Sequence, residues 1–158
     1  MIRIGLGFDV HRVEAGGGMT LGGLWVPCAY RVIAHSDGDI VLHAIMDAML
    51  GALALGDIGQ LFPDTDASFQ GADSAELTRE VRRLCLAKGY SVSNLDVTII
   101  CEFPKIRLIQ EPMRQCIADV LETVVDQISV KATTTEQLGF IGRGEGIAVT
   151  ASVLMRAH

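Results

Sequence analysis

Apolar and polar positions along this chain fall into two kinds of pattern. Strand-like patterns occupy four segments, residues 2–13, 92–102, 128–133 and 147–156. Helix-like spacing of apolar positions covers three segments, residues 39–55, about 73–88 and about 112–124. This irregular succession predicts an α+β fold, in which a mixed four-stranded sheet has its helices packed on one face.

Glycines refine this picture. Gly22-Gly23 separates two apolar triplets, which predicts an N-terminal β-hairpin. Gly5 and Gly7 lie within the first strand and allow another backbone to approach it closely. Two stretches rich in glycine are expected to be loops, residues 56–71 and 140–146.

The helix predicted over residues 39–55 is apolar nearly all round, so we expect it to be buried. It is too short to cross a bilayer, and His43 and Asp47 interrupt it, so no membrane partner is expected. Neither a targeting segment nor a C-x-x-C pair is evident, and the four cysteines have apolar neighbours. We therefore expect reduced thiols and a cytoplasmic protein.

Composition adds two limits. The 158 residues fit one domain spanning 1–158, and 49% hydrophobic against 20% charged residues predicts a packed core. The formal net charge of -6 argues against a nucleic-acid partner, which needs a basic face. An acidic protein that binds a phosphate ester must also gather positive charge locally.

Two segments carry candidate metal ligands. Asp9 and His11 are two residues apart on a predicted strand, so their side chains point to the same face. Asp39, His43 and Asp47 are spaced by four on the buried helix and share one side of it. A polar strand end and a solvated helix stripe are the alternatives, but buried carboxylates without partners are costly.

Taken together, Asp9, His11 and His43 form a three-ligand set of nitrogen and oxygen donors with a fourth position open, as in catalytic zinc sites. Asp39 and Asp47 then suit a supporting role, in which either carboxylate accepts an imidazole N–H and fixes the tautomer. The sequence leaves open which of the two serves His43.

Other segments suit anions and a second cation. His35 and Ser36 precede the buried helix, where free N–H groups favour a phosphate, although helix capping is the alternative. Glu136, which follows three threonines, could hold a hard divalent cation. Arg143, which lies among glycines, could bind an anion, and a solvated turn arginine is its alternative role.

Two connections suit a nucleotide and a sugar alcohol. Lys105 and Arg107 supply positive charge where the backbone of residues 101–107 could surround a nucleobase, unless they are merely solvated. Asp57 and the segment 62–66 offer carboxylates for hydroxyl groups, while ordinary turn chemistry is the alternative.

Several motifs together resemble the 2-C-methyl-D-erythritol 2,4-cyclodiphosphate synthases, in the same order over nearly the whole chain. They are G-F-D-V-H at 7–11, A-H-S-D-G-D at 34–39 with the following D-x-x-x-H-A-x-x-D-A-x-L-G, L-G-D-I-G at 55–59, L-F-P-D-T-D at 61–66, P-K at 104–105, K-A-T-T-T-E-x-L-G-F at 131–140 and G-R-G-E-G at 142–146.

The resemblance implies that 4-diphosphocytidyl-2-C-methyl-D-erythritol 2-phosphate is converted to the cyclic diphosphate and CMP, in the non-mevalonate isoprenoid pathway. It implies zinc on Asp9, His11 and His43, and magnesium or manganese near Glu136. His35 and Thr134 would stabilise the transition state beside Ser36. The methylerythritol part would be held by Asp57, Ile58, Gly59, Phe62, Pro63, Asp64, Thr65 and Asp66, and the cytidine diphosphate part by Cys101, Pro104, Lys105, Ile106, Arg107, Thr133 and Thr135.

The resemblance also implies a homotrimer with sites between subunits, and a central cavity where Phe140 and Arg143 face an isoprenoid diphosphate. Such a reaction needs positioning and charge neutralisation, which two cations supply. Two other functions remain open: a metal-dependent phosphoesterase, and a non-enzymatic trimer that senses isoprenoid diphosphates.

Overall fold

The structure, a computed structural model, describes residues 1–158 and contains one mixed five-stranded sheet. Its strand order is β4-β1-β7-β5-β6; only β5 and β6 run parallel to each other. The strands are β1 (Ile2–Ala15), β4 (Tyr30–Val32), β5 (Tyr90–Ile100), β6 (Ile128–Thr133) and β7 (Gly146–Ala157). The mixed α+β fold is confirmed, but the predicted number of four strands is wrong. The missing strand, β4, has three residues, too few for a readable alternation.

The predicted N-terminal hairpin is present as a separate two-stranded sheet of β2 (Met19–Leu21) and β3 (Leu24–Val26). Gly22 and Gly23 make its turn with φ angles of 62° and 81°, a region that glycine enters without steric cost. Their two backbone N–H groups donate to the carboxylate of Asp39, at 2.8 Å and 2.7 Å. The hairpin is thereby tied to the start of the central helix.

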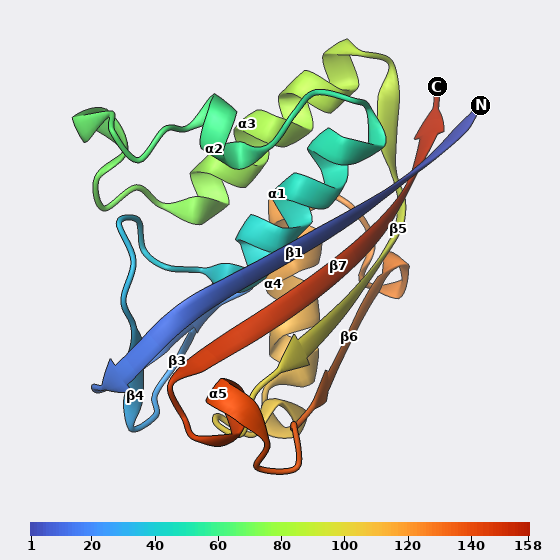
Figure 1. The fold of residues 1–158 in the computed structure, drawn as a ribbon. Helices are drawn as coiled ribbons and strands as arrows, with labels where there is room; N and C mark the ends of the chain where they lie inside the picture. Colours follow the sequence, from blue (N-terminus) through green and yellow to red (C-terminus); the bar gives the residue numbers. More distant parts are fainter.

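The three long helices cover a single face of the sheet, as predicted (Figure 1). They are α1 (Ile40–Ala52), α3 (Ser74–Ala87) and α4 (Gln110–Leu121). Every residue of α1 except Asp47 and Gly51 is buried, which confirms the prediction from its apolar sequence. The helix ends before Leu55 because Ala54 and Gly56 take positive φ angles of 56° and 85°. None of the helices has the length and apolar character needed to span a membrane.

The stretch 56–71, predicted to be a loop, contains two short helical turns, α2 (Ile58–Leu61) and η1 (Ala67–Phe69). Aspartates start both, because Asp57 accepts the N–H of Gln60 at 2.9 Å and Asp66 accepts that of Ser68 at 2.9 Å. The remaining short elements are η2 (Ile106–Leu108), η3 (Val125–Gln127) and α5 (Gly139–Gly142).

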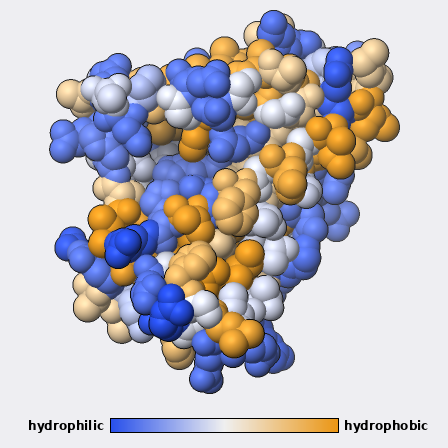
Figure 2. Space-filling view, viewed as in Figure 1, coloured by the Kyte–Doolittle hydropathy of each residue, from blue (hydrophilic) through white to orange (hydrophobic).

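The two faces of β1 serve different purposes. Gly5 and Gly7 face α1, and a Cβ atom there would lie only 1.8 Å and 1.9 Å from the carbonyl oxygens of Ala48 and Ala44. Helix and strand backbones therefore pack directly together, as the glycines predicted. The opposite face carries exposed apolar side chains, including Leu6 (70% exposed), and apolar groups gather along this side of the molecule in Figure 2.

Candidate active site

The three predicted metal ligands converge where β1 passes the first turns of α1. The Nδ1 atoms of His43 and His11 lie 3.1 Å and 3.2 Å from Oδ2 of Asp9. One donor atom from each side chain lies within 4.8 Å of the others. Strand alternation places Asp9 and His11 on the face that carries Gly5 and Gly7, and the close helix packing brings His43 to them.

This donor set fits a zinc ion. Ligand atoms about 2.0–2.1 Å from a tetrahedral zinc are about 3.3 Å apart, close to the two spacings around Asp9. Moreover, Nδ1 of His11 is buried and has no hydrogen-bond partner, although it lies 3.2 Å from Oδ2 of Asp9. A buried nitrogen with an unused lone pair is costly unless something binds it. Two imidazoles and one carboxylate leave a fourth position for a substrate oxygen.

The charges of the three side chains are coupled. Burial opposes ionisation of Asp9, but the imidazoles of His11 and His43 outweigh it and lower the pKa of Asp9 to about 2. Burial also disfavours a charged His43, yet hydrogen bonding and charge from Asp9, with smaller effects of Asp39 and Asp37, raise its pKa above the ordinary value. Asp9 therefore stays anionic across the working range of pH, ready for a cation.

Neither the Asp39 nor the Asp47 carboxylate accepts a hydrogen bond from the imidazole of His43, whose side-chain partners are Asp9, Ser36 and Ser74, so the prediction that one of the two fixes the tautomer was wrong. Asp39 is fully buried, and its carboxylate accepts the two hairpin N–H groups and the N–H of Leu42, the last at 3.0 Å. Asp47 accepts the N–H of Ile58 at 2.8 Å. Burial raises the pKa of Asp39 to about 6 and also raises that of Asp47. Both side chains fix backbone segments around the site.

The partner of His43 is instead Ser74, which sequence reasoning missed. Its Oγ lies 3.0 Å from Nε2 of His43, and it is fully buried at the start of α3. The Oγ atom of Ser36 lies 3.3 Å from the same nitrogen. Ser74 is 31 residues from His43 and sits in what reads as ordinary helix capping, so no sequence signal indicated this contact.

A cavity of about 290 Å³ opens over the three candidate metal ligands. Another cavity, of about 310 Å³, lies in a different part of the molecule. The predicted residues that line the cavity of about 290 Å³ come from β1, from α1 and its preceding loop, and from α2 and the segment that follows it. They are Asp9, His11, His35, Ser36, His43, Ile58, Gly59, Phe62 and Asp64. Asp57, Pro63, Thr65 and Asp66 do not line it. Asp57 and Asp66 instead cap the short helical turns α2 and η1, whereas the sequence offered ordinary turn chemistry as their alternative role.

A separate cavity of about 170 Å³ gathers the residues predicted for the cytidine diphosphate part, with the exception of Thr135. Its lining includes Cys101, Pro104, Lys105, Ile106, Arg107, Thr133 and Thr134. Lys105 donates to the carbonyl of Glu102 at 3.0 Å and lies 4.5 Å from the ring centre of Phe103. No residue lines both this cavity and the one over the metal ligands, so one chain keeps His35 and Thr134 in different pockets.

Glu102, another residue that sequence reasoning did not place, holds the turn after β6. Its Oε1 accepts the N–H groups of Thr135 and Gln137, at 3.1 Å and 3.2 Å, and the Thr135 hydroxyl at 3.3 Å. Within this turn, Glu136 and Gln137 take left-handed φ angles of 53° and 64°. The Glu136 side chain stays exposed, outside the pocket lining.

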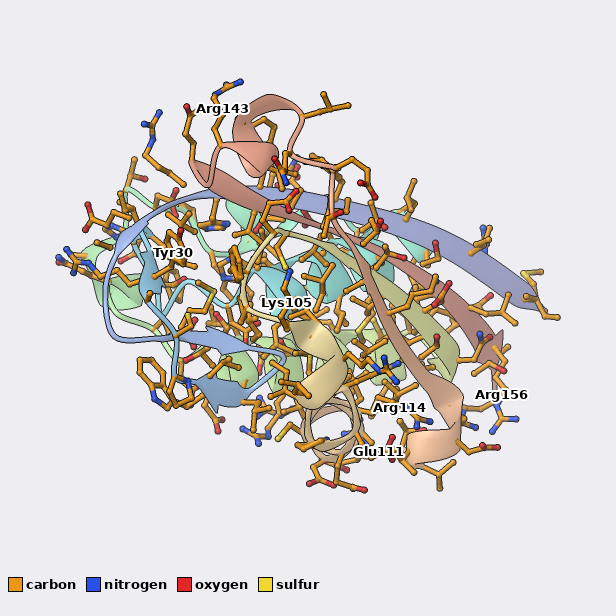
Figure 3. The ribbon with its side chains drawn as sticks, turned by 90° about the horizontal axis from the view of Figure 1, so that it is seen from below. Tyr30, Lys105, Glu111, Arg114, Arg143 and Arg156 are labelled. Carbon is orange, nitrogen blue, oxygen red and sulfur yellow. The ribbon has the colours of Figure 1, made fainter.

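The residues predicted for an isoprenoid diphosphate lie on another part of the surface. Arg143 is exposed and pairs with Glu145 at 2.9 Å, and Figure 3 shows it beyond α5, well apart from Lys105. Phe140 lies beside Gly146 and lines none of the larger pockets. In one chain these two residues therefore form no enclosed cavity.

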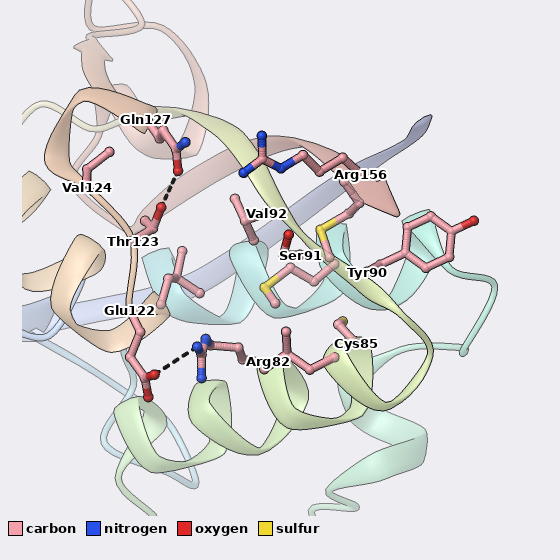
Figure 4. A pocket seen from close by; sticks show the side chains of 14 residues that line it. Arg82, Cys85, Tyr90, Ser91, Val92, Glu122, Thr123, Val124, Gln127 and Arg156 are labelled. Carbon is pink, nitrogen blue, oxygen red and sulfur yellow. Dashed lines mark hydrogen bonds and ion pairs between the residues drawn. The ribbon is translucent and has the colours of Figure 1, made fainter. Parts of the chain in front are cut away.

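The cavity of about 310 Å³ lies between the C-terminal part of α3, the segment after α4 and the start of β5 (Figure 4). It contains Arg82, which is paired with Glu122 at 2.8 Å, and Arg156. None of the predicted site residues lines it. The carboxylate and imidazole groups that could hold a metal ion meet instead around Asp9, under the cavity of about 290 Å³.

Comparisons with known proteins agree on one family. Residues 2–156 match the YgbB family. A 2-C-methyl-D-erythritol 2,4-cyclodiphosphate synthase of Acinetobacter baylyi is 59% identical over 154 residues, which cover 98% of this chain and 94% of that protein.

Two solved structures are also similar. The bifunctional IspDF of Campylobacter jejuni is 41% identical with a TM-score of 0.96; the match covers all of this chain and 43% of that longer chain. The CDP complex of IspF from Plasmodium falciparum is 39% identical with a TM-score of 0.88, over 99% of this chain and 96% of the other.

Proposed function

This chain belongs to the YgbB family, and we propose on that premise that it converts 4-diphosphocytidyl-2-C-methyl-D-erythritol 2-phosphate to 2-C-methyl-D-erythritol 2,4-cyclodiphosphate and CMP. The reaction belongs to isoprenoid biosynthesis. The 2-phosphate oxygen of the substrate attacks the β-phosphorus of the same molecule, and the bond from that phosphorus to the CMP oxygen breaks. The electron pair leaves with CMP, so no protein nucleophile is required.

The observation that carries this proposal is the convergence of Asp9, His11 and His43 at the base of an open cavity. These three residues would hold zinc, which supplies positive charge that polarises a phosphate oxygen. His35 and Ser36 line the same cavity and donate hydrogen bonds to the phosphate. Ile58, Gly59, Phe62 and Asp64 line the same cavity, where they would surround the methylerythritol part.

The cytidine diphosphate part fits the second cavity. Lys105 and Arg107 provide positive charge, and the backbone from Cys101 onward surrounds the base. Glu136 lies on the adjoining turn, and one exposed carboxylate together with substrate phosphates is a usual way to hold magnesium or manganese. Thr134 lines the cavity, from which its hydroxyl reaches the transferred phosphate.

We propose that the two cavities complete one another across subunits, in the homotrimer that the resemblance to the cyclodiphosphate synthases implies. His35 and Thr134 must act on the same phosphate, yet they line different cavities of one chain. The exposed apolar face of β1 supplies a surface for assembly, since Ile4, Leu6 and Phe8 are 76%, 70% and 60% exposed. In such a trimer, Phe140 and Arg143 from three copies form the lining of a central cavity for an isoprenoid diphosphate.

Product analysis tests the reaction. Purified protein with zinc and magnesium is expected to release CMP and a cyclic diphosphate in equal amounts, as measured by ³¹P NMR. His43→Ala should lose at least about 100-fold in turnover, because positioning a reactant is worth that much. His158→Ala, an exposed histidine at the C-terminus, is the matched control and should retain wild-type turnover. A linear hydrolysed diphosphate as the product would establish a phosphoesterase instead.

Complementation tests the shared sites. His43→Ala and Thr134→Ala are each expected to be inactive, but unfolding and refolding them together should restore activity. If the two mutated residues belong to opposite sides of one interface, random mixing leaves about one quarter of the sites intact. If the mixture stays as inactive as its components, each site lies within one chain and the trimer proposal is wrong.

A further inference from the structure

The two ring nitrogens of His43 face different surroundings. Nδ1 lies 3.1 Å from Asp9, on the side of the proposed zinc ion, and Nε2 lies 3.0 Å from Oγ of Ser74. A neutral imidazole offers a lone pair at one nitrogen only, and the other nitrogen carries the proton. For Nδ1 to bind a metal ion, Nε2 must therefore donate its proton to an acceptor.

The contacts of Ser74 make its hydroxyl oxygen that acceptor. Its own hydroxyl proton is donated to Oδ1 of Asp37. Both oxygens of Asp37 act as acceptors here, since they also accept the N–H of Asp39 at 3.1 Å and the N–H of Ser74 at 3.0 Å. The lone pairs of Ser74 Oγ are thus left facing His43. The direction of the chain of hydrogen bonds is fixed from His43 through Ser74 to Asp37.

The pair is also held rigidly. Ser74 is fully buried, and both its N–H and its hydroxyl bind Asp37. The Thr78 hydroxyl bonds at 2.7 Å only to the backbone carbonyl of Ser74, so the Ser74 hydroxyl is oriented by Asp37 and not by Thr78. Ser36 is a poorer acceptor for His43, because it lies 3.3 Å from Nε2 and already accepts the N–H of Gly38 at 3.2 Å.

We propose that Ser74 and Asp37 are positioning residues for the metal centre, which hold His43 in the tautomer whose Nδ1 binds the ion. This inference rests on the proposed function, because it takes Asp9, His11 and His43 as the zinc ligands. The supporting role that the sequence suggested for Asp39 and Asp47 is thereby assigned to Ser74 and Asp37, which both lie outside α1. Partners of this kind, when removed, typically lower metal affinity by 10–100-fold.

The test measures the zinc dissociation constant of the whole protein by competition with a chelator. Ser74→Ala removes the acceptor and is expected to weaken zinc binding by about 10–100-fold. Asp37→Asn allows the Ser74 hydroxyl to reverse its direction, so a smaller loss is expected. Thr78→Val is the matched control, since it removes a buried hydroxyl from the same helix without touching His43.

A spectroscopic measurement separates positioning from general destabilisation. In the zinc-loaded wild type, the Nε2 proton of His43 should exchange slowly with water, and in Ser74→Ala it should exchange quickly. Thr78→Val should keep slow exchange and wild-type zinc affinity even if it unfolds more easily. Equal zinc affinity in wild type and Ser74→Ala overturns the proposal, as does an equal loss in Thr78→Val.

The baseline is His43→Ala. If wild type binds zinc no better than His43→Ala, the metal centre itself is wrong and the proposed function fails with it. If wild type binds zinc through His43 but Ser74→Ala binds it equally well, only the positioning role fails. The two failures are therefore distinguishable in one titration series.

Discussion

Replacing Gly7 by alanine tests whether the close packing of α1 on β1 creates the metal centre. The added Cβ would lie 1.9 Å from the carbonyl oxygen of Ala44, whereas Cβ contacts in proteins essentially never fall below 3.0 Å. The clashing atom belongs to the helix backbone and cannot rotate away. The helix must therefore withdraw from the strand by about 1 Å, as in other overpacked cores.

The displacement reaches the site directly. His43 precedes Ala44 on the helix, and Asp9 follows Gly7 by two residues on the same face of the strand. Their separation of 3.1 Å should grow by a similar amount. We expect a loss of about 3 kcal/mol in the free energy of unfolding, the upper end for overpacking. A misplacement of about 1 Å should also reduce turnover by about 100-fold.

The assay combines urea denaturation, zinc titration and turnover. Gly51→Ala is the matched control, because Gly51 lies on the same helix and nothing lies within 4 Å of the added Cβ. It should gain about 0.5–1 kcal/mol, as alanine is the better helix former. Wild-type stability and zinc affinity in Gly7→Ala would refute the view that this contact positions the ligands.

Three further outcomes are expected. Burial raises the pKa of Asp39 to about 6, so the folded state holds this proton more tightly than the unfolded chain, in which the pKa is near 3.8. The stability of the wild type relative to Asp39→Asn should therefore fall by up to about 3 kcal/mol as the pH rises from about 4 to 6. A difference in urea midpoints that stays constant over this pH range would contradict the prediction. Leu6→Asp should yield monomers in sedimentation that still bind zinc but turn over no substrate. Glu102→Ala should release the turn holding Thr135, raising KM and the magnesium requirement while zinc affinity stays unchanged.

Some parts of the fold and site could be read from local pattern. A strand alternates its side chains, which is why Asp9 and His11 were predicted on one face. The buried helix and the hairpin at Gly22-Gly23 were likewise predicted correctly, because apolar periodicity and glycine turns act over few residues. These features depend on residues that are close together in the sequence.

Other parts were decided only by tertiary structure. Ser74 reaches His43 across 31 residues, and Glu102 reaches Thr135 across 33, through contacts that no local pattern encodes. Asp39 was predicted beside an imidazole but is used by the hairpin, since a buried carboxylate binds whichever donors packing brings to it. The sequence thus determined which residues are the candidate metal ligands, while packing of distant segments decided which side chains support them.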